Sequence, residues 1–217
     1  MAKQKGIIKL DGTIGGITFY KTTEDGYLAR EKGGVSADKI ANDPAFQRTR
    51  ENGEEFGRAG KAGKLLRNSI RAMLQNASDS RMVGRLTQKM VEVIQEDITN
   101  PRGQRNVIDG EAELLEGFEF NISGKLGTTL YAPFTGTIDR VAGTLTANIP
   151  AFVPINMLAA PGGSTHFKIV SAGAEVDFEN ETFVMDAQAT AVLPWDSAAT
   201  AVITLVNTVT ANSTHPL

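Results

Sequence analysis

The chain has 217 residues, of which 41% are apolar, and its formal net charge at pH 7 is −3. This length allows one large or two small domains with a real core, which excludes a disordered chain. The absence of cysteine excludes disulfides, thiolate metal sites and cysteine nucleophiles. No apolar run approaches the roughly 18 residues of a membrane span, and no cationic-then-apolar leader follows Met1. We therefore expect synthesis in the cytoplasm without a signal peptide or membrane insertion, and the final location stays open.

Charge is distributed unevenly along the chain. Residues 1–105 carry 19 of the 22 Lys and Arg and 13 of the 25 Asp and Glu, a net charge of +6, whereas residues 106–217 carry −9. One interpretation is a basic half that meets nucleic acid, and a second is docking between copies steered by opposite potentials. A third is two faces of one domain with no partner. The sequence leaves all three open.

Residues 1–35 have the pattern of a small glycine-rich β unit. Apolar and polar residues alternate between Asp-Gly turn signals at 11–12 and 25–26. The glycines do not form G-x-G-x-x-G and no G-K-[ST] follows, so the pattern predicts no phosphate or cofactor site. We expect the glycines of the two dipeptides to have positive φ, and Gly15 and Gly16 to form a bulge or a close backbone approach. The apolar residues of the predicted strands are Ile7, Ile8, Leu10, Ile14, Ile17 and Phe19.

Residues 36–105 predict a helical hairpin. Asp43 followed by Pro44 is a strong helix start, and the first helix should run to about Gln75. The glycines on its expected buried face, above all Gly53 and Gly60, would let another helix or subunit approach closely, although each interior glycine costs about 1 kcal/mol against alanine. The alternative is a break over 57–63. The expected buried stripe is Phe46, Thr49, Gly53, Phe56, Gly60, Gly63, Leu66, Ile70 and Leu74.

A second amphipathic helix should end near Asp97, before a stop signal at 100–103. Its apolar positions are Met82 or Val83, Leu86, Met90 and Val93 or Ile94. The short connection between the helices predicts antiparallel packing. Both helices carry basic residues, which suggests nucleic acid as an alternative partner, but nearby glutamates dilute the positive charge and no known nucleic-acid motif accompanies it. These residues are Arg58, Lys61, Lys64, Arg67, Arg71, Arg81, Arg85 and Lys89.

Residues 106–217 read as an antiparallel, immunoglobulin-like β-sandwich, so the predicted class is α+β. Short alternating segments recur between turns, with 179–181 connecting two of them. The last segment contains Val202, Ile203 and Leu205 and should leave a strand edge for another chain. The predicted strands are 114–121, 128–135, a hairpin over 136–149, 165–178, 182–193 and 200–209.

Residue types that would build a catalytic or metal site are scarce. His166 and His215 are the only histidines and lie far apart in sequence, which makes a catalytic triad or a histidine metal cluster hard to assemble. Acids at 175, 177, 179 and 181 lack a calcium-loop pattern. We therefore predict no catalytic residue, no metal, no cofactor and no enzyme activity.

Three segments carry a resemblance to an uncharacterised family of bacterial hypothetical proteins. They are KGIIKLDGTIGGITFYKTTEDGYLAREKGG, NDPAFQRTRENGEEFGRAGKAGKLLR and THFKIVSAGAEVDFENETF. The resemblance covers nearly the whole chain and implies a β-rich C-terminal half and members that continue past the position of Leu217 with further apolar, strand-like sequence. It implies no established activity and no site residues.

The functional hypothesis is contact rather than chemistry. We expect a structural protein that assembles with copies of itself or with sister proteins, as a subunit of a phage-like particle, tail tube or filament. The alternative is a binding module whose basic helical hairpin contacts nucleic acid or another polyanion. The expected assembly residues are Ile7, Ile8, Leu10, Ile14, Ile17, Phe19, Gly53, Gly60, Val202, Ile203 and Leu205.

Overall fold

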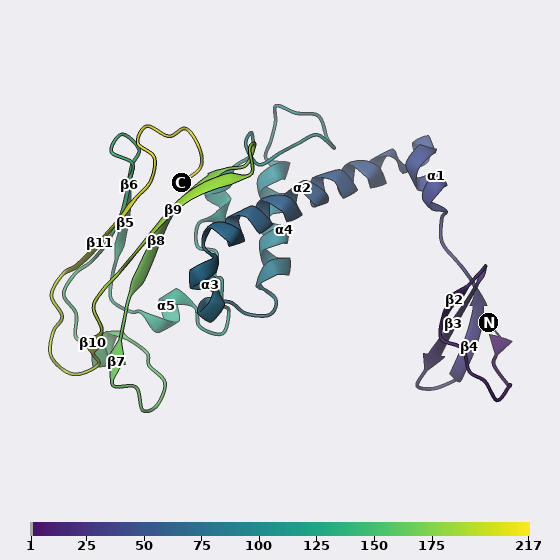
Figure 1. Cartoon of the computed structure of the whole chain (residues 1–217), viewed down its shortest axis with the longest axis horizontal. Coiled ribbons are helices and arrows are strands. Elements are labelled where there is room, and N and C mark those ends of the chain that lie inside the picture. Colours follow the sequence, from purple (N-terminus) through teal and green to yellow (C-terminus); the bar gives the residue numbers. More distant parts are fainter. Residues whose placement is uncertain (1) are drawn as a thin grey trace. The chain divides into compact units, whose positions relative to one another are not determined.

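The computed structural model describes residues 2–217, apart from the side chain of Asn76, and combines helices with antiparallel sheets (Figure 1). The chain divides into two units, Met1–Arg50 and Glu51–Leu217. The boundary falls within a helix, and the helical hairpin and the C-terminal strands belong to the same unit. The expected mixed class and the helical hairpin are confirmed. Each unit is described by itself.

The N-terminal unit contains an antiparallel four-stranded sheet in the order β1-β4-β3-β2. The strands are β1 Ala2–Lys3, β2 Gly12–Ile14, β3 Ile17–Thr22 and β4 Gly26–Glu31. Ile14 pairs with Ile17, so Gly15 and Gly16 form the two-residue turn between β2 and β3, and the expected bulge is wrong. Gly15 has φ +59°, which suits this turn. The positive φ predicted for Gly12 and Gly26 is confirmed, at +108° and +75°.

Ile7 and Ile8 do not lie in a strand, contrary to the sequence-based expectation. They belong to the connection between β1 and β2, and their apolar side chains face no partner strand. The alternation that predicted a strand there reflects a loop with two apolar residues at its tip.

The predicted helix start at Asp43 is confirmed. Ser36 caps α1 (Ala37–Asn42) through Lys39 N–H, which donates to Ser36 Oγ at 3.3 Å. The Asp43 carboxylate then accepts from Ala45 N–H at 2.9 Å and opens the short 3₁₀ helix η1 (Pro44–Phe46). Helix α2 (Gln47–Ser69) follows without interruption and is unbroken over 57–63.

The buried face of α2 differs from the expected stripe. Phe56, expected in the core, is 62% exposed. Gly53 and Gly60 face open space within the chain, since an added Cβ would meet no atom within 4 Å, so packing on the second helix is wrong at both positions and packing on another subunit stays a prediction. Gly63 does contact the second helix, its ideal Cβ lying 3.6 Å from Leu86 Cγ. The buried residues of α2 are Glu55, Ala59, Ala62, Gly63, Leu65 and Ser69.

The second half of the hairpin agrees with the sequence pattern. After α3 (Arg71–Ala77), α4 (Met82–Gln95) buries the expected residues Met82, Leu86, Met90, Val93 and Ile94. These side chains form one core with Ala59 and Ala62 of α2. The following segment contains the 3₁₀ helix η2 (Ala112–Leu115) instead of the strand predicted over 114–121, because its apolar residues pack on this helical core.

The C-terminal strands form three small antiparallel sheets, in the orders β11-β6-β5, β8-β9 and β10-β7. Figure 1 shows β8 and β9 running beside the three-stranded sheet. The predicted strand over 128–135 is largely wrong, because α5 ends at Thr129 and irregular chain with one isolated bridge at Leu130 leads to β5, whereas the hairpin over 136–149 is confirmed by β5 and β6. The immunoglobulin-like sandwich stays a prediction. The elements are α5 Leu126–Thr129, β5 Thr135–Asp139, β6 Thr144–Ile149, α6 Pro154–Met157, β7 His166–Phe167, β8 Val170–Asp177, β9 Thr182–Ala189, β10 Leu193–Pro194 and β11 Ile203–Thr208.

A second core lies among these strands and contains Leu130, Ile149, Phe152, Ile203 and Leu205. Within residues 2–217, none of the helices combines the length and the apolar character that crossing a bilayer requires.

Candidate functional site

One face of the N-terminal sheet is apolar and exposed. Side chains alternate between the faces of a sheet, and the strand register therefore places Ile14, Ile17 and Phe19 on one face together with Ala29 and Ala2. The opposite face carries Thr13, Thr18, Tyr20, Arg30 and Lys3, and it also carries Leu28, the one buried side chain among residues 2–50. The first face therefore presents exposed apolar side chains beside Glu31, whereas the opposite face is mainly polar around the buried Leu28.

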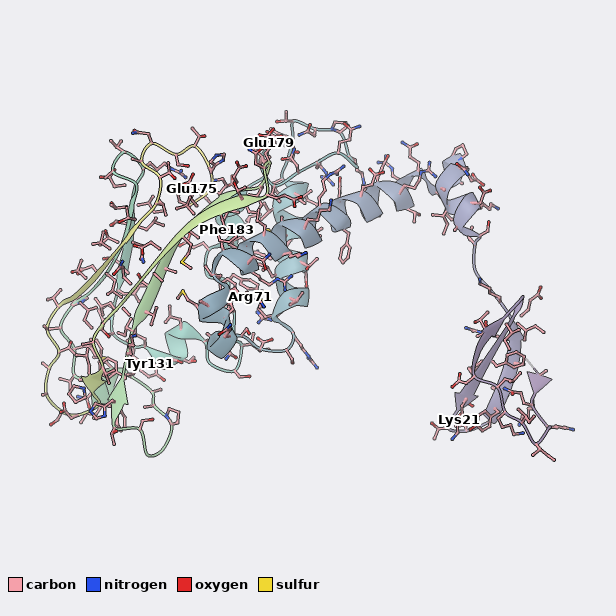
Figure 2. The ribbon with its side chains drawn as sticks, in the orientation of Figure 1. Lys21, Arg71, Tyr131, Glu175, Glu179 and Phe183 are labelled. Carbon is pink, nitrogen blue, oxygen red and sulfur yellow. The ribbon has the colours of Figure 1, made fainter. Side chains whose placement is uncertain are left out.

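The apolar face is exposed in the chain as it stands. Ile14 is 61% and Ile17 is 47% exposed. Lys21 and Tyr27 end the face with a cation–π contact in which the ammonium lies 5.4 Å from the ring centroid, and Figure 2 labels Lys21 in this sheet. A shallow hollow of about 400 Å³ beside this face is lined by Ala2, Ile17 and Ala29 and by the charged residues Arg30 and Glu31.

The unit has almost no core of its own. Among residues 2–50 only Leu28 is buried. A sheet needs a covered apolar face for independent stability, and contiguous exposed apolar surface marks sites of protein contact. The apolar face of this unit therefore has the character of an unoccupied interface.

The loop between β1 and β2 presents two further apolar residues. Ile7 and Ile8 are 103% and 80% exposed at its tip, flanked by Lys5 and Lys9. Gln4 ties the base of this loop, because its side-chain carbonyl accepts from Leu10 N–H at 2.9 Å. Its amide nitrogen also donates to the carbonyls of Leu10 and Leu28, at 3.3 and 2.9 Å. The hydrogen bonds of Gln4 therefore fix the base of the loop, and Ile7 and Ile8 project from it into solvent.

The predicted C-terminal contact residues have mixed positions. Val202 is exposed, but Ile203 and Leu205 are buried in the second core, so these two side chains do not form a contact surface. Beyond its pairing with β6, β11 also meets β9, where Thr208 N–H donates to Asp186 Oδ2 at 2.9 Å. The fully exposed edge strand of the same sheet is β5, which pairs only with β6.

A groove lies within the larger unit, between the segment 112–120 and strand β8. It consists of two adjoining hollows of about 610 and 490 Å³. They share six lining residues, namely Ala112, Glu113, Ile138, Phe178, Pro216 and Leu217. Phe118 and Phe120 line the larger hollow and contact each other edge to face, with ring centroids 5.0 Å apart. We call this feature the apolar groove, and sequence reasoning missed it because its walls come from segments far apart in the chain.

The rim of the apolar groove is acidic. Glu111, Glu113, Glu116 and Glu179 are exposed and line it. Its basic residue Arg140 is engaged with the backbone, donating to His215 O at 2.9 Å. The groove therefore offers apolar walls and an excess of negative over positive charge. Figure 2 labels Glu179, at the turn that joins β8 to β9.

The buried acids of the chain hold its loops in place. Glu55 accepts from Arg105 at both carboxylate oxygens and from Gly103 N–H, all at 2.8 Å, and the Arg105 hydrogen bonds lower the pKa of Glu55. Burial raises the pKa of Asp97, but hydrogen bonds led by those of Asn100 outweigh burial and lower it to about 2. Glu175 likewise accepts from Ser213 Oγ at 2.6 Å. Each of these carboxylates has hydrogen-bond donors within the chain, as structural carboxylates do.

The two histidines, His166 and His215, have different surroundings in the structure. His166 is exposed, with Nδ1 2.9 Å from Thr165 Oγ1, whereas His215 lies 3.7 Å from Asp177. Over the described part of the chain, no three His, Asp or Glu side chains gather closely enough to hold a metal ion. Trp195 donates from Nε1 to Leu158 O at 3.2 Å, as a packing residue does.

Comparison of the chain with protein-family models, with curated proteins and with solved structures finds no match in any of the three. The candidate site therefore rests on the geometry of this chain.

Proposed function

We propose that this protein is a non-enzymatic structural subunit that assembles with copies of itself or with sister proteins, in a particle, tube or filament, through its N-terminal unit. The observation that carries the proposal is the contrast within residues 2–50 between one buried side chain, Leu28, and an exposed apolar face around Ile14 and Ile17. Removing apolar surface from water contributes about 25 cal/mol of favourable free energy per Å², which is the usual driving force of association. A second chain packed on this face would remove its apolar surface from water.

The sheet also offers backbone contacts. Strand β2 spans three residues and is an edge strand of the sheet, so no strand of the sheet pairs with its outer side. Unpaired N–H and C=O groups at such an edge are a template for an added strand. The proposed assembly contact therefore combines an apolar face with an incomplete strand edge.

The alternative of polyanion binding has less support. Four of the eight basic residues on the helical hairpin have partners within the chain: Arg58 donates to Gly103 O, Arg67 to Gly63 O, and Arg85 and Lys89 pair with Asp79 and Glu92. Exposed and unengaged guanidinium and ammonium groups are what phosphate contacts need. Salt-dependent retention of the purified protein on DNA would favour this alternative instead.

The test is sedimentation velocity of the full chain at several concentrations. We expect wild type to form oligomers, and Ile17→Asp to weaken association at least about tenfold, since a central apolar contact exchanged for a charge is costly. The matched control is Thr13→Asp, which places the same charge on the opposite face of the adjacent strand and should leave association unchanged.

Two results would overturn the proposal. The first is a wild-type protein that stays monomeric from micromolar to millimolar concentration and that also sediments without any partner when it is mixed with an extract of its own cells. The second is equal loss of association in both variants, because charge on either face would then act non-specifically.

A further inference from the structure

We infer that the apolar groove is the receptor for the loop at 5–10 of a second copy of this chain. The inference rests on the proposed self-assembly and adds the site at which one copy binds the loop of the next. The ligand class is a basic segment with two adjacent exposed isoleucines, and the groove matches each of those properties.

The apolar match is direct. Ile7 and Ile8 are 103% and 80% exposed, so nothing in their own chain covers them. The larger hollow of the groove, about 610 Å³, has walls that include Phe118, Phe120 and Val176. Volumes between about 300 and 1,000 Å³ accept ligands several side chains in size. Two isoleucine side chains therefore fit the groove and would leave water on docking.

The charge match is complementary. Lys5 and Lys9 flank the isoleucines, while Glu113 and Glu116 flank the larger hollow. Complementary potentials steer association and fix its register. The same matching holds across the halves of the chain, +6 for residues 1–105 and −9 for residues 106–217.

The loop is also prepared for insertion. Gln4 pins its base to Leu10 by two hydrogen bonds, and Lys9 Nζ donates to Gln4 O at 2.5 Å. A pinned loop loses less conformational entropy on binding than a free terminus does. Because loop and groove are different surfaces, each copy presents both and contacts can repeat from copy to copy, as a heterologous interface requires.

The natural absence of cysteine makes disulfide trapping specific. Protein carrying Ile8→Cys is mixed with protein carrying Glu116→Cys under mild oxidation. We expect a disulfide-linked dimer of one chain of each kind, formed on the order of a hundredfold faster than the controls, because docking raises the effective thiol concentration to the millimolar range. The controls exchange one partner for Glu24→Cys, on the turn between β3 and β4, or for Val192→Cys, outside the groove.

Each outcome decides the inference. Cross-linking no faster than in the controls overturns it, as does preferential Ile8→Cys homodimerisation. A double variant that closes within one chain at a rate independent of concentration overturns it too, since the occupant would be the chain's own loop. If wild type sediments as an oligomer while no loop-to-groove cross-link forms, assembly stands and only the groove assignment fails.

Charge reversal provides a second readout that does not depend on cysteines. Lys5→Glu and Glu113→Lys should each weaken oligomerisation by about two- to fivefold, the range expected for exposed ion pairs. The double variant should recover wild-type association, because reversed charges again face each other. Loss that adds up in the double variant instead of cancelling would contradict loop docking in the groove.

Discussion

Glu55 on α2 and Arg105 beyond α4 form a two-pronged ion pair, with Glu55 Oε1 and Oε2 each 2.8 Å from a nitrogen of Arg105. The Glu55 side chain is 4% exposed, so this pair lies away from water. Removing Glu55 takes the acceptor away from the half-buried Arg105 and from the buried Gly103 N–H, and breaking such a pair costs roughly 3–5 kcal/mol. We expect Glu55→Ala to lower the free energy of unfolding by that amount in a urea titration, and the exposed Glu54→Ala to change it by less than about 0.5 kcal/mol.

The nearby Asp97 predicts how stability depends on pH. Its pKa falls from 3.8 to about 2 in the folded chain. A carboxyl with a lowered folded pKa stabilises the fold at pH above its unfolded pKa, and that contribution disappears as the pH falls from about 4 to 2. The contribution is about 2 kcal/mol.

Asp97→Asn isolates this effect. The variant should be less stable than wild type at pH 7 and should lose less stability than wild type between about pH 4 and 2, as measured by urea unfolding at each pH. If the free energy of unfolding fell equally with pH in the two proteins, Asp97 would not be the source of the pH dependence.

The two helix glycines that sequence patterning treated alike should respond differently to substitution. Gly63 lies against Leu86 and Met90, at 3.6 and 3.7 Å from an ideal Cβ, whereas Gly60 faces open space. Gly60→Leu should gain about 1 kcal/mol of helix propensity. Gly63→Leu should lose about 1–3 kcal/mol through overpacking, less the same gain. Thermal melts of both variants measure the difference, and equal melting temperatures would contradict the packing at Gly63.

How far the sequence could predict the structure is clearest in the helical hairpin. The buried residues of α4 were predictable because Met82, Leu86 and Met90 are large and apolar at helical spacing. The buried face of α2 was not, because small residues carry little hydrophobic signal. Its most informative buried residue, Glu55, is acidic and is buried only because Arg105 lies opposite it, a partner 50 positions away in sequence.

The candidate site shows the same division. The apolar character of Ile14 and Ile17 was evident from alternation, and the register of β2 with β3 placed them on one face. Alternation also suggested a contact surface at Ile203 and Leu205, but the pattern could not show which face of β11 packs on the core. The loop at 5–10 resembled a strand because of its apolar residues, and the sequence pattern could not show that the Gln4 side chain holds it as a loop.

A glycine in β8 reports on the packing of the C-terminal strands. A Cβ on Gly173 would lie 2.8 Å from Asn207 Cβ and 2.9 Å from Leu145 Cδ1, closer than carbon atoms approach. Gly173→Ala should therefore destabilise the chain by about 1–3 kcal/mol. Gly136→Ala is the matched control, since Gly136 also lies in a strand and has open space around it. Similar melting temperatures for the two variants would argue against the contact between β8 and β11.

The last prediction separates the assembly role of the N-terminal sheet from the stability of the larger unit. Residues 2–35 include a single buried side chain, Leu28, whereas the helical core and the strand core both lie beyond Arg50. A chain beginning at Ser36, which keeps the cap of α1, should therefore fold. We expect its circular dichroism to retain the helical signal and its unfolding to stay cooperative, while sedimentation shows a monomer. The full chain bearing Thr13→Asp serves as the control that still associates. Undiminished oligomerisation of the shortened chain would place the assembly contacts in the larger unit instead, and unfolding of the shortened chain would show that the sheet stabilises the unit it precedes.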